Sequence, residues 1–334
     1  MVFAGADLPP PLTGRTGFTE WQFDLWLAVG LCVVAALYLW GALRLARRGD
    51  RWPVSRTIAF VGLGLGSIGV ATMSSLGVYD GTLFWMHMVQ HMVLQMVAPV
   101  FLALGAPVTL ALRTLHRRPR QWLLGAIHSW VGRVLAFPPV GMAAFVVAPF
   151  ALYFTGWYQA TLTHTGLHEL QHLLFVAVGA MFMWPLLGID PIPNRSPYLL
   201  RVLTTFLVLP AHAILGITIM QSKTLIAGSY YVGLGRTWGP SLADDQNIGG
   251  GILWASGDLV GLLFLAVLIA QWMRADTREA ARIDRALDRA AATAVGTGNS
   301  GEGELSAYNA MLTRLAEHDA VREAQDVLRR TGPN

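Results

Sequence analysis

Long runs of apolar residues dominate the pattern of this chain. Seven of them reach the roughly 17–25 residues that a helix needs to cross the hydrocarbon core of a bilayer. They cover residues 21–45, 58–77, 83–112, 134–154, 168–187, 199–220 and 250–273. Polar and charged residues gather in the short stretches between the runs and at the two ends. The pattern predicts an all-α polytopic membrane protein, with a bundle of seven transmembrane helices over residues 21–273.

Composition supports a membrane protein and narrows the possible chemistry. The 334 residues are 54% hydrophobic and only 13% charged, and the mean hydropathy is +0.48. Such a chain is too apolar for a soluble domain. The net charge of +4 sits mainly in particular connections, so it does not indicate nucleic-acid binding. With Cys32 as the single cysteine, a metal site would have to use histidine, methionine or carboxylate ligands.

The arginines between the runs predict an orientation. They cluster in the first and third connections and in the C-terminal tail, while the second and fourth connections hold no Lys or Arg. The positive-inside rule then places the N-terminus outside and the C-terminus in the cytoplasm of a bacterial cell membrane. Residues 1–20 would form an extracytoplasmic segment, and residues 274–334 a cytoplasmic helical tail. The charges used here include Arg44, Arg47, Arg51, Arg113, Arg117, Arg133, Arg195 and Arg201.

Two histidine pairs are the strongest chemical signal. His87 and His91 are four residues apart at the start of the third run, and His168 and His172 repeat that spacing at the start of the fifth. Residues four apart share one face of a helix. Interfacial histidines in contact with water would also explain a single pair. Two pairs on the same side of the membrane favour a shared metal site, because ionisable groups inside a membrane are costly and usually functional.

Depth along the helices adds further candidates. At about 1.5 Å per residue, His91 lies roughly 12 Å inside the outer end of its helix and His212 about 13 Å inside its own. We therefore expect His212 to join the two pairs. Imidazole and thioether ligands together suit copper. The predicted ligands are His87, His91, His168, His172 and His212, and the possible accessory residues are Met73, Met220 and Asp258.

Three other interpretations stay open. Residues 168–172 read His-Glu-Leu-Gln-His, which fits the His-Glu-x-x-His pattern of zinc metalloproteases, with Glu169 as general base. An intramembrane protease would follow from it. Histidines on facing helices could instead bind haem. A copper permease would need polar or thioether groups that continue toward the cytoplasmic side.

Several segments resemble one known family. They are residues 87–91 (His-Met-Val-Gln-His), 104–107 (Leu-Gly-Ala-Pro), 168–172 (His-Glu-Leu-Gln-His) and 245–254, where Asp-Gln, glycines and a tryptophan lead into the last run. Together they resemble the cytochrome c oxidase assembly factor (CtaG) family over the seven runs. The histidine pairs match that family directly, whereas His212, Met73 and Met220 rest on the depth argument alone.

The resemblance implies a role in the maturation of haem–copper terminal oxidases of the respiratory chain. We then expect a non-enzymatic assembly factor that binds copper, as Cu(I), at a histidine cluster in the outer leaflet. Its partners would be an extracytoplasmic copper donor, a subunit of the haem–copper oxidase and the lipid bilayer, with no nucleic acid.

Overall fold

The computed structural model describes residues 8–191, 193, 196–295 and 308–313, and side chains in the last long helix up to residue 289. All regular secondary structure in these ranges is helical. The chain divides into two compact units, Met1–Leu268 and Ile269–Asn334. The all-α prediction is therefore confirmed for the residues that the structure describes.

Six helical stretches in the described ranges are long and apolar enough to cross a membrane. They are Leu25–Arg47 (α2), Val54–Tyr79, Phe84–Thr114, Thr165–Leu187 (α13), Tyr198–Gln221 (α14) and Leu242–Arg289. The helices α11 (Pro138–Phe154) and α12 (Trp157–Thr163) meet at 71° and make a seventh span if they are counted together. The structure thus contains six to seven of the seven predicted spans. The short helices outside them include α1 (Thr16–Thr19), α9 (Arg117–His128), α10 (Trp130–Leu135) and α15 (Gly228–Gly233).

The second and third spans are built from several shorter helices. The second contains α3 (Val54–Thr57), the π-helix η1 (Ile58–Leu65), α4 (Gly66–Met73) and α5 (Ser75–Tyr79). The third contains α6 (Phe84–Met92), the π-helix η2 (Val93–Val97), α7 (Ala98–Leu104) and α8 (Pro107–Thr114). α7 ends at Leu104, and Ala106, which directly precedes α8, has a positive φ of 50°, a conformation that residues other than glycine seldom adopt. Short π-helices inside longer helices often mark functional sites.

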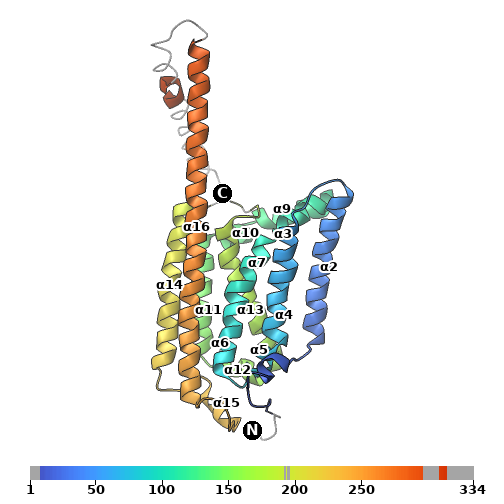
Figure 1. Ribbon diagram of the computed structural model, residues 1–334, viewed down its shortest axis with the longest axis vertical. Helices are drawn as coiled ribbons and strands as arrows, with labels where there is room; N and C mark the ends of the chain where they lie inside the picture. The colour runs from blue at the N-terminus through green and yellow to red at the C-terminus, as the bar shows by residue number, and fades with distance from the viewer. Residues whose placement is uncertain (1–7, 192, 194–195, 296–307, 314–334) are drawn as a thin grey trace, which may run out of the picture. The chain divides into compact units, whose positions relative to one another are not determined.

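The helices of the first unit lie side by side in a bundle (Figure 1). In its centre α7 contacts η1 and α13, and α13 also contacts η2, α11 and α12. The helix α2 stands at one edge of the bundle (Figure 1), where side chains such as Trp26, Val33 and Leu37 are exposed. An exposed apolar surface of this kind is suited to lipid. Among these central helices, α13 carries His168 and His172 of the predicted ligands.

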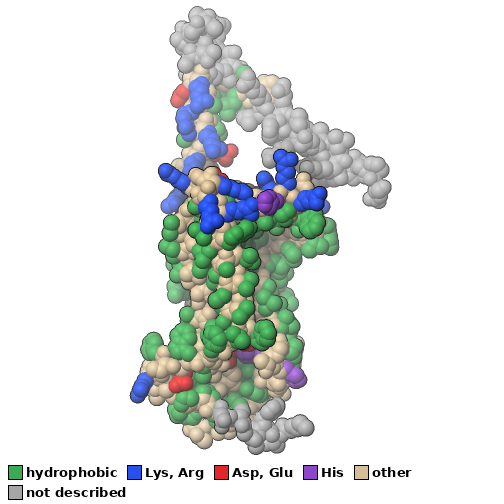
Figure 2. All heavy atoms as spheres, turned by 90° about the vertical axis from the view of Figure 1, so that its right-hand side faces the viewer, with side chains coloured by type: hydrophobic (Ala, Val, Ile, Leu, Met, Phe, Trp, Pro, Cys, Tyr) green, Lys and Arg blue, Asp and Glu red, His purple; other side chains and the backbone are tan. Residues whose placement is uncertain are grey.

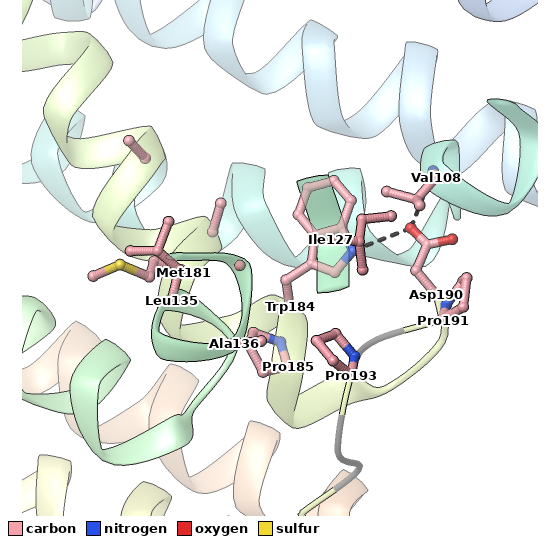
Figure 3. Close-up of a pocket in the computed structure, with 13 residues that line it drawn as sticks. Val108, Ile127, Leu135, Ala136, Met181, Trp184, Pro185, Asp190, Pro191 and Pro193 are labelled. Carbon is pink, nitrogen blue, oxygen red and sulfur yellow. Dashed lines mark hydrogen bonds between the residues drawn. The ribbon is translucent and has the colours of Figure 1, made fainter. Parts of the chain in front are cut away.

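A buried carboxylate fixes the start of α8. Asp190 accepts hydrogen bonds from the backbone N–H groups of Val108 and Thr109 at 3.2 and 2.7 Å, and from the indole N–H of Trp184 at 3.1 Å. Figure 3 shows Trp184 and Asp190 turned toward this helix start, beside a largely apolar hollow of about 440 Å³. The first N–H groups of a helix have no partner within the helix, so a carboxylate there stabilises it.

The last long helix differs from the prediction. We expected a span over 250–273 followed by a tail, yet α16 runs without a break over Leu242–Val295. Gly249, Gly250 and Gly251 begin the expected span but do not interrupt the helix. A glycine costs only about 1 kcal/mol in a helix interior, and contacts with α14 offset that cost, since a Cβ at Gly250 would lie 2.7 Å from the carbonyl oxygen of Gly216.

Most of the basic residues of the first unit gather at one end of the bundle. Figure 2 shows Lys and Arg side chains in a band at the end where Figure 1 places α9 and α10. Arg201 was counted among the charges between the apolar runs, but it lies inside α14 and is 5% exposed. Its guanidinium donates to the carbonyl oxygens of Ser196 and Leu186. Arg195 lies outside the described residues.

Candidate metal centre

Both histidine pairs lie on helices that begin at the end of the bundle opposite to the basic band. The helix α6 carries residues 87–91, which we call the first histidine segment, and α13 carries residues 168–172, the second histidine segment. In each the sequence is His-x-x-Gln-His. His87 and His91 are fully buried, and His172 is 7% exposed. Three of the four paired histidines are therefore buried among the helices.

A buried carboxylate caps the start of α6. Asp245 of α16 is 1% exposed and accepts from the backbone N–H groups of Phe84 and Trp85 at 3.2 and 3.0 Å. The guanidinium of Arg236 lies 3.2 Å from the same carboxylate, and both side chains are 2% exposed. The neighbouring Gln246 accepts from the backbone N–H of Ile226 at 2.8 Å. Asp245 thus ties α16 to the start of α6, and Gln246 ties α16 to the connection that follows α14.

Close contact between helices positions α13. A Cβ built on Gly179 would overlap the carbonyl oxygen of Gln95 in η2, so only glycine fits at this crossing. The contact lies seven residues beyond His172 along α13 and four residues beyond His91 along the third span. It therefore holds the two histidine segments at a fixed separation.

A group of three potential ligands forms at the surface end of α13. Asp80, His168 and His172 each offer one ligand atom, and these atoms lie within 4.8 Å of one another. Nε2 of His168 lies 2.9 Å from Oδ2 of Asp80, and Nε2 of His172 lies 3.7 Å from the same oxygen. The two imidazole rings are 4.5 Å apart between centroids. We call these three residues the Asp80 group.

The carboxylate of the Asp80 group is charged and already partnered. Asp80 follows α5 and is 5% exposed. Burial alone would raise the pKa of its carboxyl, but the interactions with His168 and His172 outweigh burial and hold that pKa below its usual value. Gln90 donates to Asp80 at 2.9 Å and to the carbonyl oxygen of Ala71 at 3.0 Å. An anionic carboxylate beside two imidazoles is a suitable ligand set for a transition-metal ion.

The glutamines connect the two histidine segments reciprocally. Nε2 of His172 lies 3.1 Å from Oε1 of Gln90, which belongs to the first segment. Nε2 of Gln171, in the second segment, lies 3.4 Å from Nε2 of His87. Each glutamine thus contacts a histidine of the other helix. Nε2 of His172 is also the nitrogen that faces Asp80, so the contact with Gln90 would be given up when this nitrogen binds a metal.

His87 and His91 form a second layer, separate from the Asp80 group. The hydroxyl of Tyr153 in α11 lies between them, 3.0 Å from Nε2 of His87 and 2.8 Å from Nδ1 of His91. The other ring nitrogen of His91 is hydrogen-bonded to Gln95, and its ring stacks on Phe175 at 4.1 Å. Nδ1 of His87 has no hydrogen-bond partner among the described residues.

The expected convergence of five imidazoles on one ion is not what the structure shows. The metal-competent group in the described chain contains His168 and His172, but not His87, His91 or His212. His212 lies in α14 with its ring 5.1 Å from that of Phe145. Depth estimated along each helix is therefore insufficient, because it ignores the direction in which each side chain points.

The accessory candidates lie in three different places. Met73 ends α4, and its carbonyl oxygen accepts from the backbone N–H of Gln22 at 2.9 Å. Met220 lies near the end of α14 against Gly250. Asp258 is half-buried in α16 and makes no hydrogen bond or ion pair with any histidine in the described ranges. Whether any of them binds a metal stays a prediction.

Sequence reasoning missed four polar residues of the candidate centre, which are Asp80, Gln90, Gln171 and Tyr153. Two signals in the sequence point to them. Both histidine segments contain a glutamine directly before the second histidine. The sequence analysis used only the spacing of the histidines and not this shared glutamine. Asp80 is the single carboxylate in the short connection between the second and third apolar runs. Tyr153 gives no comparable signal, because a tyrosine at the end of an apolar run is common at membrane interfaces.

Comparison with known proteins places these features in a family. The model of the cytochrome c oxidase caa3 assembly factor family matches residues 36–275, which include both histidine segments and Asp80. Uncharacterized proteins of Mycobacterium leprae and Mycobacterium tuberculosis are each 37% identical to the chain over 94% of its length. The chain spans about half the length of these relatives, covering 47% of each. No solved structure matches the chain. On the family match, this chain belongs to the cytochrome c oxidase caa3 assembly factor family.

Proposed function

We propose that this protein supports assembly of a haem–copper oxidase by binding copper at the Asp80 group and passing it on. Family membership supports the oxidase part of the proposal. The metal part rests on one observation, the three potential ligand atoms of Asp80, His168 and His172 within 4.8 Å of one another. Copper is the cargo in this proposal, and the protein acts as a carrier and not as an enzyme.

The distribution of charge supports an extracytoplasmic position for the Asp80 group. The basic band lies at the α9–α10 end of the first unit (Figure 2), while α5, α6 and α12 lie at the other end (Figure 1). Under the positive-inside rule the basic end faces the cytoplasm of a bacterial membrane. The N-terminus and the Asp80 group then face outward, where a copper donor and the nascent oxidase subunit would exchange the ion with it.

The exposure of the group suits exchange. The side chain of His168 is 18% exposed, whereas those of His172 and Asp80 are 9% and 7% exposed. An incoming donor would first reach His168, and the inner two residues would then complete the coordination. Because the imidazoles bind metal through unprotonated nitrogens, binding displaces the protons now shared with Asp80 and Gln90. Three protein ligands leave a position open for the departing partner.

The oxidation state of copper determines which residues of the Asp80 group bind it most strongly. Imidazole binds both Cu²⁺ and Cu⁺, whereas a carboxylate oxygen is a hard ligand that favours Cu²⁺. We propose that Cu⁺ is the transferred ion and is held mainly by His168 and His172. Asp80→Asn should then weaken Cu²⁺ binding by about tenfold or more and change Cu⁺ affinity much less.

Metal analysis of the purified protein tests the proposal. His168→Ala/His172→Ala should lower bound copper, and it should lower oxidase activity in cells that depend on the protein. His164→Ala is the matched control, because His164 lies four residues before His168, directly follows α12 and is exposed. Equal copper content in the double variant and the control would overturn the assignment of the Asp80 group. Normal copper content with normal oxidase activity would overturn the function as well.

A zinc hydrolase is the second candidate, because Asp80 would complete the ligand set of the His-Glu-x-x-His pattern. The position of Glu169 argues for the carrier. Its carboxylate lies 3.5 Å from Nδ1 of His172, whereas Nε2 of that ring faces Asp80. Glu169 therefore lies on the side of the ring turned away from the ligand group, and that ring nitrogen makes no hydrogen bond among the described residues. Glu169→Gln should abolish activity in a hydrolase and leave copper transfer largely intact in a carrier.

A further inference from the structure

A buried histidine with one unpartnered ring nitrogen lies outside the Asp80 group. His212 of α14 is 3% exposed, and its Nε2 has no partner among the described residues. An unsatisfied polar atom in a buried position costs about 1–3 kcal/mol. An unpaired buried atom of this kind needs a physical explanation. One explanation is a bound ion or molecule that the imidazole contacts.

His212 borders a small enclosed cavity that two methionines also line. The cavity measures about 10 Å³ and lies between Met96 of η2, Met183 of α13 and His212. Met96 and Met183 are 2% and 1% exposed. On the α16 side the lining residues include Gly257 and Gly261, which leave room because they have no side chain. The volume is about that of one water-sized particle.

The lining chemistry favours a soft cation over a water molecule. A buried water molecule needs about two to four polar partners. Besides His212 the polar side chain at the cavity is Thr205, and its hydroxyl already donates to the carbonyl oxygen of Arg201 at 2.9 Å. The other heteroatoms are the two thioether sulfurs. One imidazole and two thioethers form a ligand set that selects Cu⁺.

We infer that His212, Met96 and Met183 form a second, internal Cu⁺ site. The three residues come from three helices and share no ligand with the Asp80 group. The site goes beyond the proposed function, because it stands or falls independently of copper exchange at the surface. A singly charged ion costs less to bury than a divalent one, which suits this apolar interior.

Cu⁺ titration of the full chain in detergent, against a chromogenic Cu⁺ chelator, tests the site. Met96→Leu/Met183→Leu should lose about one equivalent of Cu⁺ and keep its fold, since leucine and methionine have similar volumes. Met181→Leu is the matched control, because Met181 lies on α13 two residues from Met183 and lines the separate hollow near Trp184. That variant should bind as much Cu⁺ as the unmodified protein.

X-ray absorption separates the internal site from the Asp80 group. In His168→Ala/His172→Ala the remaining Cu⁺ should show sulfur neighbours, and these should disappear when Met96 and Met183 are also replaced by leucine. Failure of the proposed function would appear as unchanged copper binding in the histidine variant, which leaves the internal site standing. Absence of sulfur neighbours in every variant, with equal Cu⁺ content in the leucine variant and its control, would overturn the inference.

Discussion

Asp245→Asn is the substitution that most directly tests how the start of α6 is held in the bundle. The carboxylate caps the start of α6, three residues before His87, and it lies 3.2 Å from the guanidinium of Arg236. The asparagine keeps one oxygen acceptor but removes the negative charge. Arg236 then stays buried, at 2% side-chain exposure, without its anionic partner.

The size of the effect follows from the two interactions. A lost or weakened N-terminal cap costs about 1 kcal/mol. Removing one partner of a buried ion pair costs about 3–5 kcal/mol. Arg236 also donates to the carbonyl oxygens of Trp238 and Pro240. These hydrogen bonds partly compensate for the loss of the anionic partner of the guanidinium. We therefore expect a loss of about 3 kcal/mol in the free energy of unfolding, most of it from the unpaired guanidinium.

Unfolding in mixed detergent micelles, followed by tryptophan fluorescence, measures this loss. Asp244→Asn is the matched control, because Asp244 is the adjacent residue, is exposed and accepts from Ser241. It should change the free energy of unfolding by less than about 0.5 kcal/mol. The double variant Asp245→Asn/Arg236→Met should be more stable than the sum of its single effects predicts. Equal stability of Asp245→Asn and Asp244→Asn, or strict additivity in the cycle, would refute the reasoning.

Three further substitutions test other contacts of the bundle. Gly179→Ala should force α13 away from η2 and lower the yield of folded protein and its bound copper, whereas Gly166→Ala, on the same helix with open space around its Cβ position, should lower neither. Asp190→Ala should lower the free energy of unfolding by about 1–3 kcal/mol, because the first N–H groups of α8 lose their buried acceptor; a loss below 0.5 kcal/mol by the same micelle assay would contradict this. Tyr153→Phe should destabilise the protein by about 1–3 kcal/mol through the two imidazole nitrogens left without the hydroxyl, while Tyr230→Phe should have little effect; equal melting temperatures for the two variants would count against the bridging role.

The sequence alone was sufficient for the fold class and for the helices that carry the chemistry. Apolar runs of spanning length are required because backbone polar groups cannot stay unpaired in lipid, so length and hydropathy identify the spans. The His-x-x-x-His spacing identified α6 and α13 because residues four apart always share a helix face. The sequence analysis did not predict that the last span and the following tail form one continuous helix, α16. The sequence contains no strong signal that tells whether the helix stops or continues between these two parts.

The composition of the metal centre was decided by tertiary structure. Whether His172 faces Asp80 or His87 depends on how α13 is rotated and where it crosses η2, and that crossing is set by a long-range contact at Gly179. His212 lies in α14 with its ring 5.1 Å from that of Phe145, beside a small cavity that two methionines also line, and it is not part of the Asp80 group. Periodicity fixes the face that residues share within one helix, whereas the relative rotation of two helices comes only from their contacts with each other.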